Sequence, residues 1–180
     1  MKKQIFLFQL LLMLTGAFSP CYAEEYVSKE KKIKSAIILN FIRYTEWPES
    51  SFQSESDEIN VCIYTDAEME EVLLKSNGKK INDRKINIRV LYRLNNLSEC
   101  HVLYANSLDR SQASRTYSSI VNKPVLTVTD HVENETNAGI INLIRDKGKL
   151  RFQISRDKCE SAKLKLSSRL VKLSVNNKTK

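Results

Sequence analysis

The segment Asn40–Pro48, with the sequence NFIRYTEWP, closes an apolar stretch and contains the only tryptophan of the chain. In the apolar stretch, large apolar residues recur three and four positions apart, which predicts a helix with a broad buried face. This stripe comprises Ile33, Ile37, Ile38, Phe41 and Ile42. Pro48 disfavours helical geometry at Trp47, so the helix should end there. We therefore expect a helix-to-strand corner in which Trp47 packs against the core.

The amino terminus has the three parts of a secretory signal peptide. Lys2 and Lys3 precede an apolar run over residues 5–18, and small residues precede the acidic pair at positions 24 and 25. The apolar run is shorter than the roughly 20 residues that span a bilayer. We expect residues 1–23 to be cleaved off after Ala23. Acylation of Cys21, as in a lipoprotein, is the weaker alternative because Ser19-Pro20 lacks the small residues expected before such a cysteine.

The intact chain has 29 lysine and arginine residues against 21 aspartate and glutamate residues, a net charge of +8. Loss of the two leader lysines lowers this net charge to about +6. The basic residues are spread along the chain and are not interleaved with aromatic residues in one patch, which argues against nucleic-acid binding. No proline-, glycine- or serine-rich linker divides residues 24–180, so we expect a single domain.

The expected mature chain retains Cys62, Cys100 and Cys159, which allows at most one internal disulfide and three possible pairings. Cys62 lies in the strand-like run INVCIYT, and Cys100 directly precedes HVLYAN. Two strands of one sheet would bring these cysteines together, so we favour the pair Cys62–Cys100. Cys159 would then be a free thiol at the start of a helix, and a partly buried, inert thiol is the preferred interpretation over a reactive one.

Strands and helices are expected to alternate after Pro48 and an exposed loop. The expected strands are 59–65, 86–91, 97–106 and 124–128, and the expected helices are 67–75 and 111–120. Asp66 is the expected N-cap of the first of these helices, and Asn77-Gly78 should end it. This alternation favours a parallel sheet with helices on its faces.

The last third of the chain departs from the alternation. Segments 139–144 and 150–154 flank a charged turn in which Gly148 suits a positive φ, so we expect a β-hairpin. From Ser155 to Leu173 we expect one helix whose buried face comprises Ala162, Leu166, Leu170 and Leu173. The predicted fold is α/β, a mixed and mostly parallel central sheet flanked by helices, with a C-terminal β-hairpin and a closing amphipathic helix.

Several segments, in this order, resemble the YfiR family of periplasmic regulators. They are the leader, the helix ending in NFIRYTEWP, VCIY followed by Cys100, PVLTVTD, the pair GIINL and LRFQI, and the final LKLSSRLVKLS. The resemblance covers about Lys34 to Leu173. It implies an α/β sheet fold, a tendency to form homodimers, and a disulfide at the positions of Cys62 and Cys100.

The resemblance also implies a function. A protein of this kind would bind the periplasmic part of an inner-membrane diguanylate cyclase, repress cyclic di-GMP synthesis, and be sequestered in turn by an OmpA-like outer-membrane lipoprotein. Two positions depart from the family pattern. Members often have a glycine pair where this chain has Ala138-Gly139. The best-known member has a second disulfide late in the chain, whereas Cys159 has no mature partner for redox control through such a bridge.

Residues that could support catalysis are few. His101 and His131 each lie beside a strand-like run, where a structural histidine is more common than a catalytic base. The cysteines and histidines show no spacing typical of zinc ligands, and the glycines form no phosphate-binding loop. Ser167-Ser168 lacks the context of a nucleophile elbow. We therefore expect no enzyme activity, no metal site and no cofactor.

Two functional hypotheses follow. In the first, the protein regulates a partner by contact alone, and Tyr44, Trp47 and Arg169 contribute to a partner or dimer interface, because such residue types dominate interface energies. In the second, it is a periplasmic small-ligand sensor or carrier with a pocket at the carboxyl ends of strands, near Thr65-Asp66 and Thr129-Asp130. For these two Thr-Asp pairs, roles in helix caps or turns are the preferred interpretation.

Overall fold

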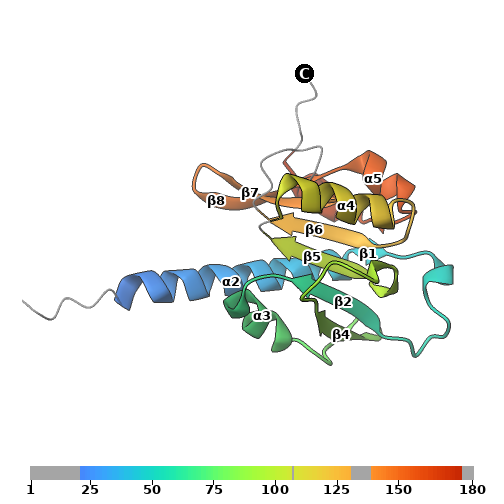
Figure 1. Cartoon of the computed structure of the whole chain (residues 1–180), viewed down its shortest axis with the longest axis horizontal. Helices are drawn as coiled ribbons and strands as arrows, with labels where there is room; N and C mark the ends of the chain where they lie inside the picture. Colours follow the sequence, from blue (N-terminus) through green and yellow to red (C-terminus); the bar gives the residue numbers. More distant parts are fainter. Residues whose placement is uncertain (1–20, 107, 131–138, 176–180) are drawn as a thin grey trace, which may run out of the picture.

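The computed structural model describes residues 21–106, 108–130 and 139–175 and is built around one mixed β-sheet (Figure 1). The strands of this sheet are β2 (Ile59–Tyr64), β3 (Lys80–Ile81), β4 (Arg84–Val90), β5 (Val102–Asn106), β6 (Leu126–Asp130), β7 (Ile141–Asp146) and β8 (Lys149–Ile154). The helices are α2 (Cys21–Arg43), α3 (Ala67–Leu74), α4 (Arg110–Ile120), α5 (Arg156–Ser161) and α6 (Ser168–Leu173). A separate two-stranded sheet pairs β1 (Thr45–Glu46) with β9 (Lys165–Leu166).

The strand order of the main sheet is β3-β4-β2-β5-β6-β7-β8. Strands β4, β2, β5, β6 and β7 are parallel, and the short β3 and the terminal β8 are antiparallel to their neighbours. The predicted α/β fold with a mostly parallel sheet is therefore confirmed. The strand expected over 97–106 begins only at Val102, because the 3-10 turn Leu97–Glu99 precedes it.

The two faces of the sheet carry different cores. Val61 and Ile63 of β2 belong to the large aliphatic core under α2 and α3, whereas Cys62 and Tyr64 point to the opposite face, which α4 covers. This division follows from the alternation of side chains along a strand. The α4 face is smaller in apolar content and includes the disulfide, so a covalent link reinforces the side of the sheet that has less buried aliphatic surface.

Helix α2 packs on the sheet through Ile38, Phe41 and Ile42, which are at most 1% exposed. Ile33, expected in the same stripe, is 47% exposed. Ile38 lies five positions after Ile33, which places the two side chains about 140° apart around a helix of 3.6 residues per turn. The predicted stripe was thus too wide. Figure 1 also shows the amino-terminal part of α2 extending past the sheet.

The start of β7 requires a glycine. A Cβ atom at Gly139 would lie 2.6 Å from the carbonyl oxygen of Thr127, closer than a real contact allows. The close approach lets two threonines of β6 accept backbone hydrogen bonds, Thr129 Oγ1 from the Gly139 N–H at 3.0 Å and Thr127 Oγ1 from the Ile140 N–H at 2.7 Å. Gly139 therefore aligns β7 beside β6 through contacts that no larger residue permits.

The predicted hairpin is present as β7 and β8. Its turn residues Lys147 and Gly148 both have positive φ, 48° and 75°, which is the backbone geometry of a two-residue type I′ turn. The carbonyl of Phe152 on β8 accepts a hydrogen bond from the Val175 N–H at 2.8 Å. The segment after α6 therefore contacts the outer edge of β8, the last strand of the sheet.

The prediction of a single closing helix over 155–173 is wrong, because the segment is divided into α5, β9 and α6. After α5, Lys163 adopts φ +56°, and the Leu164 N–H donates to the Cys159 carbonyl at 3.1 Å. This reversal buries Leu164 and lets β9 pair with β1, contacts that a continuous helix would forfeit. Leu173, expected on the buried face, is 63% exposed.

The disulfide joins Cys62 of β2 to Cys100, which precedes β5, with Cα atoms 5.7 Å apart and a sequence separation of 38. This is the pairing that the strand arrangement favoured. Both cysteines are at most 4% exposed and pack with Leu97, Leu103 and other residues of the α4-side core. The crosslink thus closes the whole α3–β4 crossover, from β2 to the entrance of β5.

Replacing Cys62 and Cys100 together by alanine is expected to lower the free energy of unfolding by about 4 kcal/mol, because the crosslink restricts a loop of this length in the unfolded chain. Urea denaturation of the exported, oxidised protein measures this loss. Cys159→Ala is the control, since it removes a buried thiol but no crosslink, and it should cost about 1 kcal/mol. Equal losses for the double variant and the control would contradict the stabilising role of the disulfide.

Candidate interaction surfaces

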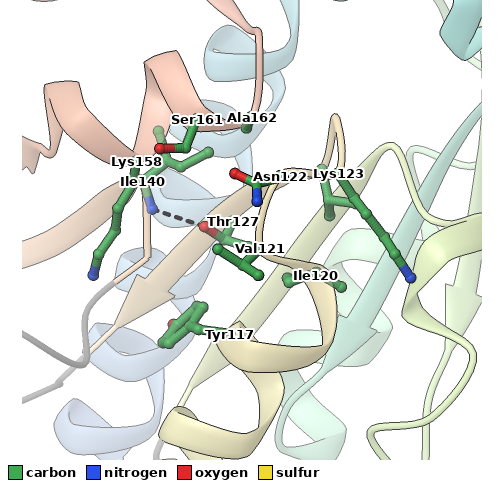
Figure 2. A pocket seen from close by; sticks show the side chains of 11 residues that line it. Tyr117, Ile120, Val121, Asn122, Lys123, Thr127, Ile140, Lys158, Ser161 and Ala162 are labelled. Carbon is green, nitrogen blue, oxygen red and sulfur yellow. Dashed lines mark hydrogen bonds between the residues drawn. The ribbon is translucent and has the colours of Figure 1, made fainter.

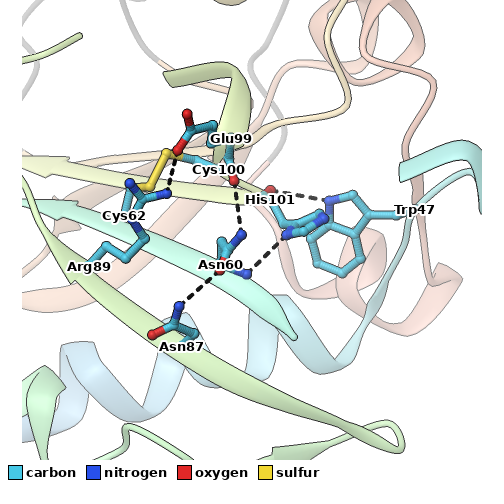
Figure 3. The surroundings of a disulfide bond; sticks show 8 residues. All are labelled: Trp47, Asn60, Cys62, Asn87, Arg89, Glu99, Cys100 and His101. Carbon is cyan, nitrogen blue, oxygen red and sulfur yellow. Dashed lines mark hydrogen bonds and ion pairs between the residues drawn. A yellow bond between two sulfur atoms is a disulfide. The ribbon is translucent and has the colours of Figure 1, made fainter. Parts of the chain in front are cut away.

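Trp47 and His101 form a tight corner near the amino ends of β2 and β5 (Figure 3). The Trp47 indole N–H donates to the His101 carbonyl at 3.1 Å. The His101 ring accepts from the Asn60 N–H through Nδ1 at 2.9 Å, and its Nε2 lies 2.9 Å from the Ser51 carbonyl, which only a protonated Nε2 can satisfy. The expected corner with a core-packed tryptophan is therefore observed.

The same arrangement removes His101 from the candidates for a general base. Burial lowers the pKa of His101, the hydrogen bond to Ser51 opposes this, and the nearby Arg84 lowers the pKa further. The imidazole is therefore neutral near pH 7, with both ring nitrogens engaged. Its ring stacks on Phe52 with centroids 4.6 Å apart, and Arg84 covers the Phe52 ring. These contacts give His101 a structural role.

A polar network continues from this corner across the amino ends of the strands (Figure 3). The Asn60 side-chain amide donates to the Glu99 carbonyl at 3.1 Å and its oxygen accepts from Asn87 at 3.1 Å. Arg89 of β4 forms an ion pair with Glu99 at 2.8 Å. The network ties β4 and β2 to the residue before Cys100, so it holds the same junction as the disulfide.

The interface residues expected from the sequence lie on segments that the structure brings together. Thr45 pairs with Leu166, and the Ser167 N–H donates to the Tyr44 carbonyl at 2.9 Å. Tyr44 is half-buried, and Arg169 is exposed on the first turn of α6. Trp47 is half-buried and directed at His101, so its indole serves the corner itself. We refer to Tyr44 and Arg169, with the β1–β9 pair between them, as the β1–α6 corner.

The carboxyl ends of the strands, proposed as a ligand pocket, are occupied by ion pairs to α2. Lys31 contacts Asp66 at 2.5 Å and Glu68 at 2.7 Å. Lys34 contacts Asp130 at 2.6 Å, and the two side chains are only 9% and 3% exposed. Asp66 has the preferred role of a helix cap, because it accepts from the Met69 N–H at the start of α3. Asp130 is neither a cap nor a turn residue, since it ends strand β6 and anchors α2 through Lys34.

The pKa of Asp66 reflects these contacts. Partial burial raises the pKa, but hydrogen bonds from Lys31, the Met69 N–H and Asn106 outweigh this effect and lower it to about 2. A carboxylate held in this way is ionised throughout the neutral range and already has its donors. It serves to dock α2 and α3 at this edge of the sheet.

An apolar cavity of about 130 Å³ lies between α4 and α5 (Figure 2). Its lining includes Tyr117, Val121 and Ile140, and the Lys158 ammonium lies 5.3 Å from the centre of the Tyr117 ring. Burial lowers the pKa of Lys158. Among the described residues, the lining has the hydroxyl groups of Tyr117 and Ser161 and the Lys158 ammonium, and no carboxylate, thiol or imidazole.

A second hollow, of about 360 Å³, lies between the segment after β4 and α4. Its lining comprises Tyr64, Tyr92, Arg93, Leu94, Gln112, Arg115, Thr116 and Ser119, and we call it the arginine–tyrosine groove. Sequence reasoning missed this surface. The adjacent Tyr92 and Arg93 were a possible signal, because both are frequent interface residues and follow directly on an expected strand.

In the described part of the chain, no group of three or more histidine, cysteine, aspartate or glutamate side chains is placed to hold a metal ion. His131 lies outside the described residues. Cys159 is buried and donates its S–H to the Leu164 carbonyl at 3.2 Å. Burial and the neighbouring Glu160 raise its pKa, which keeps the thiol protonated and unreactive. None of the helices among the described residues has the length and apolar character needed to cross a bilayer.

These features define a disulfide-linked α/β module whose described side chains form contact surfaces and structural networks. The chain belongs to the YfiR/HmsC-like family, whose match covers residues 31–175. Comparison with curated proteins finds no match. Members of the family are periplasmic and in general non-catalytic regulators, in agreement with the resemblance drawn from the sequence.

The role of the Asp66 charge can be tested with Asp66→Asn, which keeps a capping oxygen and removes the ion pair. Because the pKa of folded Asp66 is below its unfolded value of about 3.9, the stabilisation is present above pH 4 and disappears as the pH falls through about 2. Since Asp66 is partly exposed, we expect a loss of about 1 kcal/mol at pH 7. Urea denaturation of both proteins at pH 7 and pH 2 measures it, and a difference independent of pH would contradict the assignment.

Proposed function

We propose that the protein is a periplasmic negative regulator that binds the periplasmic part of an inner-membrane diguanylate cyclase and represses cyclic di-GMP synthesis. An OmpA-like outer-membrane lipoprotein sequesters the regulator and relieves repression. The observation that carries this proposal is the membership of residues 31–175 in the YfiR/HmsC-like family. The engagement of His101, Cys159, Asp66 and Asp130 in structural contacts supports an action through binding alone.

Repression by binding requires a preference for one state of the cyclase. A regulator that moves a two-state target from almost fully active to almost fully inactive must bind the inactive state about 5.5 kcal/mol more tightly. A rigid surface provides such discrimination at a low entropic cost, because few groups must be ordered on binding. The disulfide and the ion pairs to α2 supply this rigidity.

We place the contact with a partner, or between two copies of the chain, at the β1–α6 corner. The corner offers the half-buried Tyr44 and the exposed guanidinium of Arg169 on a backbone fixed by strand pairing. Tyrosine and arginine contribute strongly when an interface buries them. The Trp47 indole donates a hydrogen bond to the His101 carbonyl, so Trp47 contributes to the corner by positioning the β1 segment.

The apolar cavity between α4 and α5 favours a second candidate function, a periplasmic small-ligand sensor or carrier. Its volume of about 130 Å³ suits a single ring or a short alkyl group, since an engineered apolar cavity of similar size binds benzene. A thermal-shift screen with benzene-sized aromatic compounds and short alkyl compounds tests this candidate, because a ligand that binds only the folded state raises the melting temperature. No stabilisation by any compound would remove it.

Deletion of the gene is expected to raise cellular cyclic di-GMP and surface adhesion, since the cyclase would lose its repressor. Mass-spectrometric quantification of cyclic di-GMP in the deletion strain and in a complemented strain measures the effect. Complementation with the exported protein should restore the low level. Unchanged cyclic di-GMP in the deletion strain would contradict the proposed function.

Arg169→Glu is expected to weaken dimerisation or capture of the cyclase's periplasmic part by about tenfold, because it reverses a charge at the β1–α6 corner. Analytical ultracentrifugation and a pull-down with the purified periplasmic part measure the two contacts. Arg156→Glu is the matched control, as it makes the same charge change at an exposed position of α5. Dimerisation and capture that both remain intact in Arg169→Glu would refute the placement of the interface.

A further inference from the structure

The arginine–tyrosine groove lies at the carboxyl ends of β2 and β4, on the face of the sheet that α4 covers. Tyr64 is the last residue of β2, and Tyr92 and Arg93 follow β4 directly. Arg115 approaches from α4 on the opposite side. In α/β sheets, the crevice outside the carboxyl ends of the strands is the usual place for a binding site. The groove therefore has a position suited to recognition.

The chemistry of the groove is one-sided in charge. Its lining has two guanidinium groups, from Arg93 and Arg115, and no carboxylate. Arg115 uses part of its guanidinium to hold Ser111 Oγ at 2.8 Å, whereas Arg93 forms no hydrogen bond or ion pair with the described residues. Guanidinium groups pair with carboxylates in bidentate geometry. An occupant with carboxylates complements this lining, and a basic occupant would be repelled.

The shape of the groove favours a protein segment over a small molecule. Tyr92 at the rim is 84% exposed, the largest exposure among the large hydrophobic side chains described. Small-molecule pockets bury most of their ligand, which a groove with so exposed a wall does not achieve. Tyrosine and arginine are the residue types that contribute most when a protein partner covers them. An extended peptide bearing acidic side chains fits both the open shape and the charge.

The walls of the groove are held in place before any partner binds. On one side, Leu94 packs against both small cores of the α4 face, and the segment beyond it is fixed by buried Leu97 and the Cys100 disulfide. On the other side, α4 begins with a capping box formed by Asp109 and Gln112. A preformed surface loses little entropy on binding.

We propose that the arginine–tyrosine groove docks an acidic segment of a protein partner, with Arg93 and Arg115 pairing its carboxylates and Tyr92 covering the bound chain. The proposal deepens the proposed function, on which it rests for the identity of the partner. The groove follows the carboxyl ends of the strands, whereas the β1–α6 corner adjoins the Trp47–His101 contact at the amino end of β5. The regulator therefore has two separate contact surfaces.

The test uses the full mature chain and a fluorescein-labelled peptide of six aspartates around one phenylalanine, with its asparagine counterpart as the neutral peptide. Fluorescence anisotropy should show binding of the acidic peptide only. Arg93→Glu should weaken binding at least tenfold, because it replaces a guanidinium that pairs the peptide's carboxylates with a like charge, and Tyr92→Ala should weaken it severalfold. Both side chains are exposed, so the fold should tolerate the changes. Lys85→Glu and Arg156→Glu are the controls, with the same charge change at exposed positions elsewhere, and should change affinity less than twofold.

Amide NMR shifts on titration should concentrate on residues 64, 92–94 and 112–119. Shifts scattered over the lysine-rich surface, equal weakening by the control variants, or no binding would overturn the proposal. Displacement of the peptide by inorganic phosphate at low concentration would also overturn it, since it would indicate a site for free anions. If a strain with Arg93→Glu represses normally while gene deletion raises cyclic di-GMP, the docking role of the groove would be refuted and the proposed function would stand. If the acidic peptide binds the groove but gene deletion leaves cyclic di-GMP unchanged, the proposed regulatory function would be refuted and the docking site would stand.

Discussion

The buried ion pair between Lys34 and Asp130 is the contact on which the placement of α2 depends. The two groups are 2.6 Å apart, nearly inaccessible, and separated by 96 residues in the sequence. The Tyr104 hydroxyl also donates to Asp130 at 3.4 Å, and burial followed by the Asp130 charge raises the pKa of Tyr104. Lys34 also contacts Glu30 at 2.9 Å. Removing one member of a buried ion pair typically costs about 3–5 kcal/mol. The pair therefore selects one position of α2 along the sheet more than it adds net stability.

Once α2 is placed at this end, its other end determines the corner. The buried face formed by Ile38, Phe41 and Ile42 brings the chain to Trp47, whose indole N–H reaches the carbonyl before β5. Thr45, between them, is buried and pairs with Leu166. The carboxyl-terminal segment thus obtains its position from the amino-terminal helix. This dependence explains why Tyr44 and Arg169, the two contact residues of the β1–α6 corner, come from opposite ends of the sequence.

The sequence was sufficient wherever a residue acts locally. Asp66 as an N-cap and Gly148 in the hairpin turn each specify backbone geometry within a few positions. The prediction that Pro48 ends the helix at Trp47 was wrong, because α2 ends at Arg43 and Thr45–Glu46 already pair with β9. The cysteine pairing could be inferred because Cys62 lies within one strand-like run and Cys100 directly precedes another, and both runs are strands of one sheet. Contacts between residues far apart in the sequence could not be predicted from such local signals. The break at Lys163 is one example, since its benefit comes from burying Leu164 and pairing β9 with β1, and a leucine pattern at helical spacing contains no information about that competing contact.

The two candidate surfaces also differ in how far the sequence could predict them. Tyr44 and Arg169 could be named from residue type, and strand pairing then brought their segments together. The arginine–tyrosine groove needed the structure, because Tyr64, Arg93 and Arg115 come from three elements whose proximity follows only from the strand order β4-β2-β5 and the position of α4. The disulfide and the Asn60 network hold the sheet region between the two surfaces in one arrangement.

That rigidity has a consequence for the proposed regulation. Coupling between two separate binding surfaces requires an element with two arrangements that both partners bias. The region between the β1–α6 corner and the groove is a hydrogen-bonded parallel sheet with a covalent crosslink, which offers one arrangement. A partner at one surface would therefore leave the affinity of the other nearly unchanged. If a lipoprotein sequesters the regulator as proposed, it would act by holding the regulator away from the inner membrane or by competing for the same surface, and not by transmitting a conformational change through the sheet.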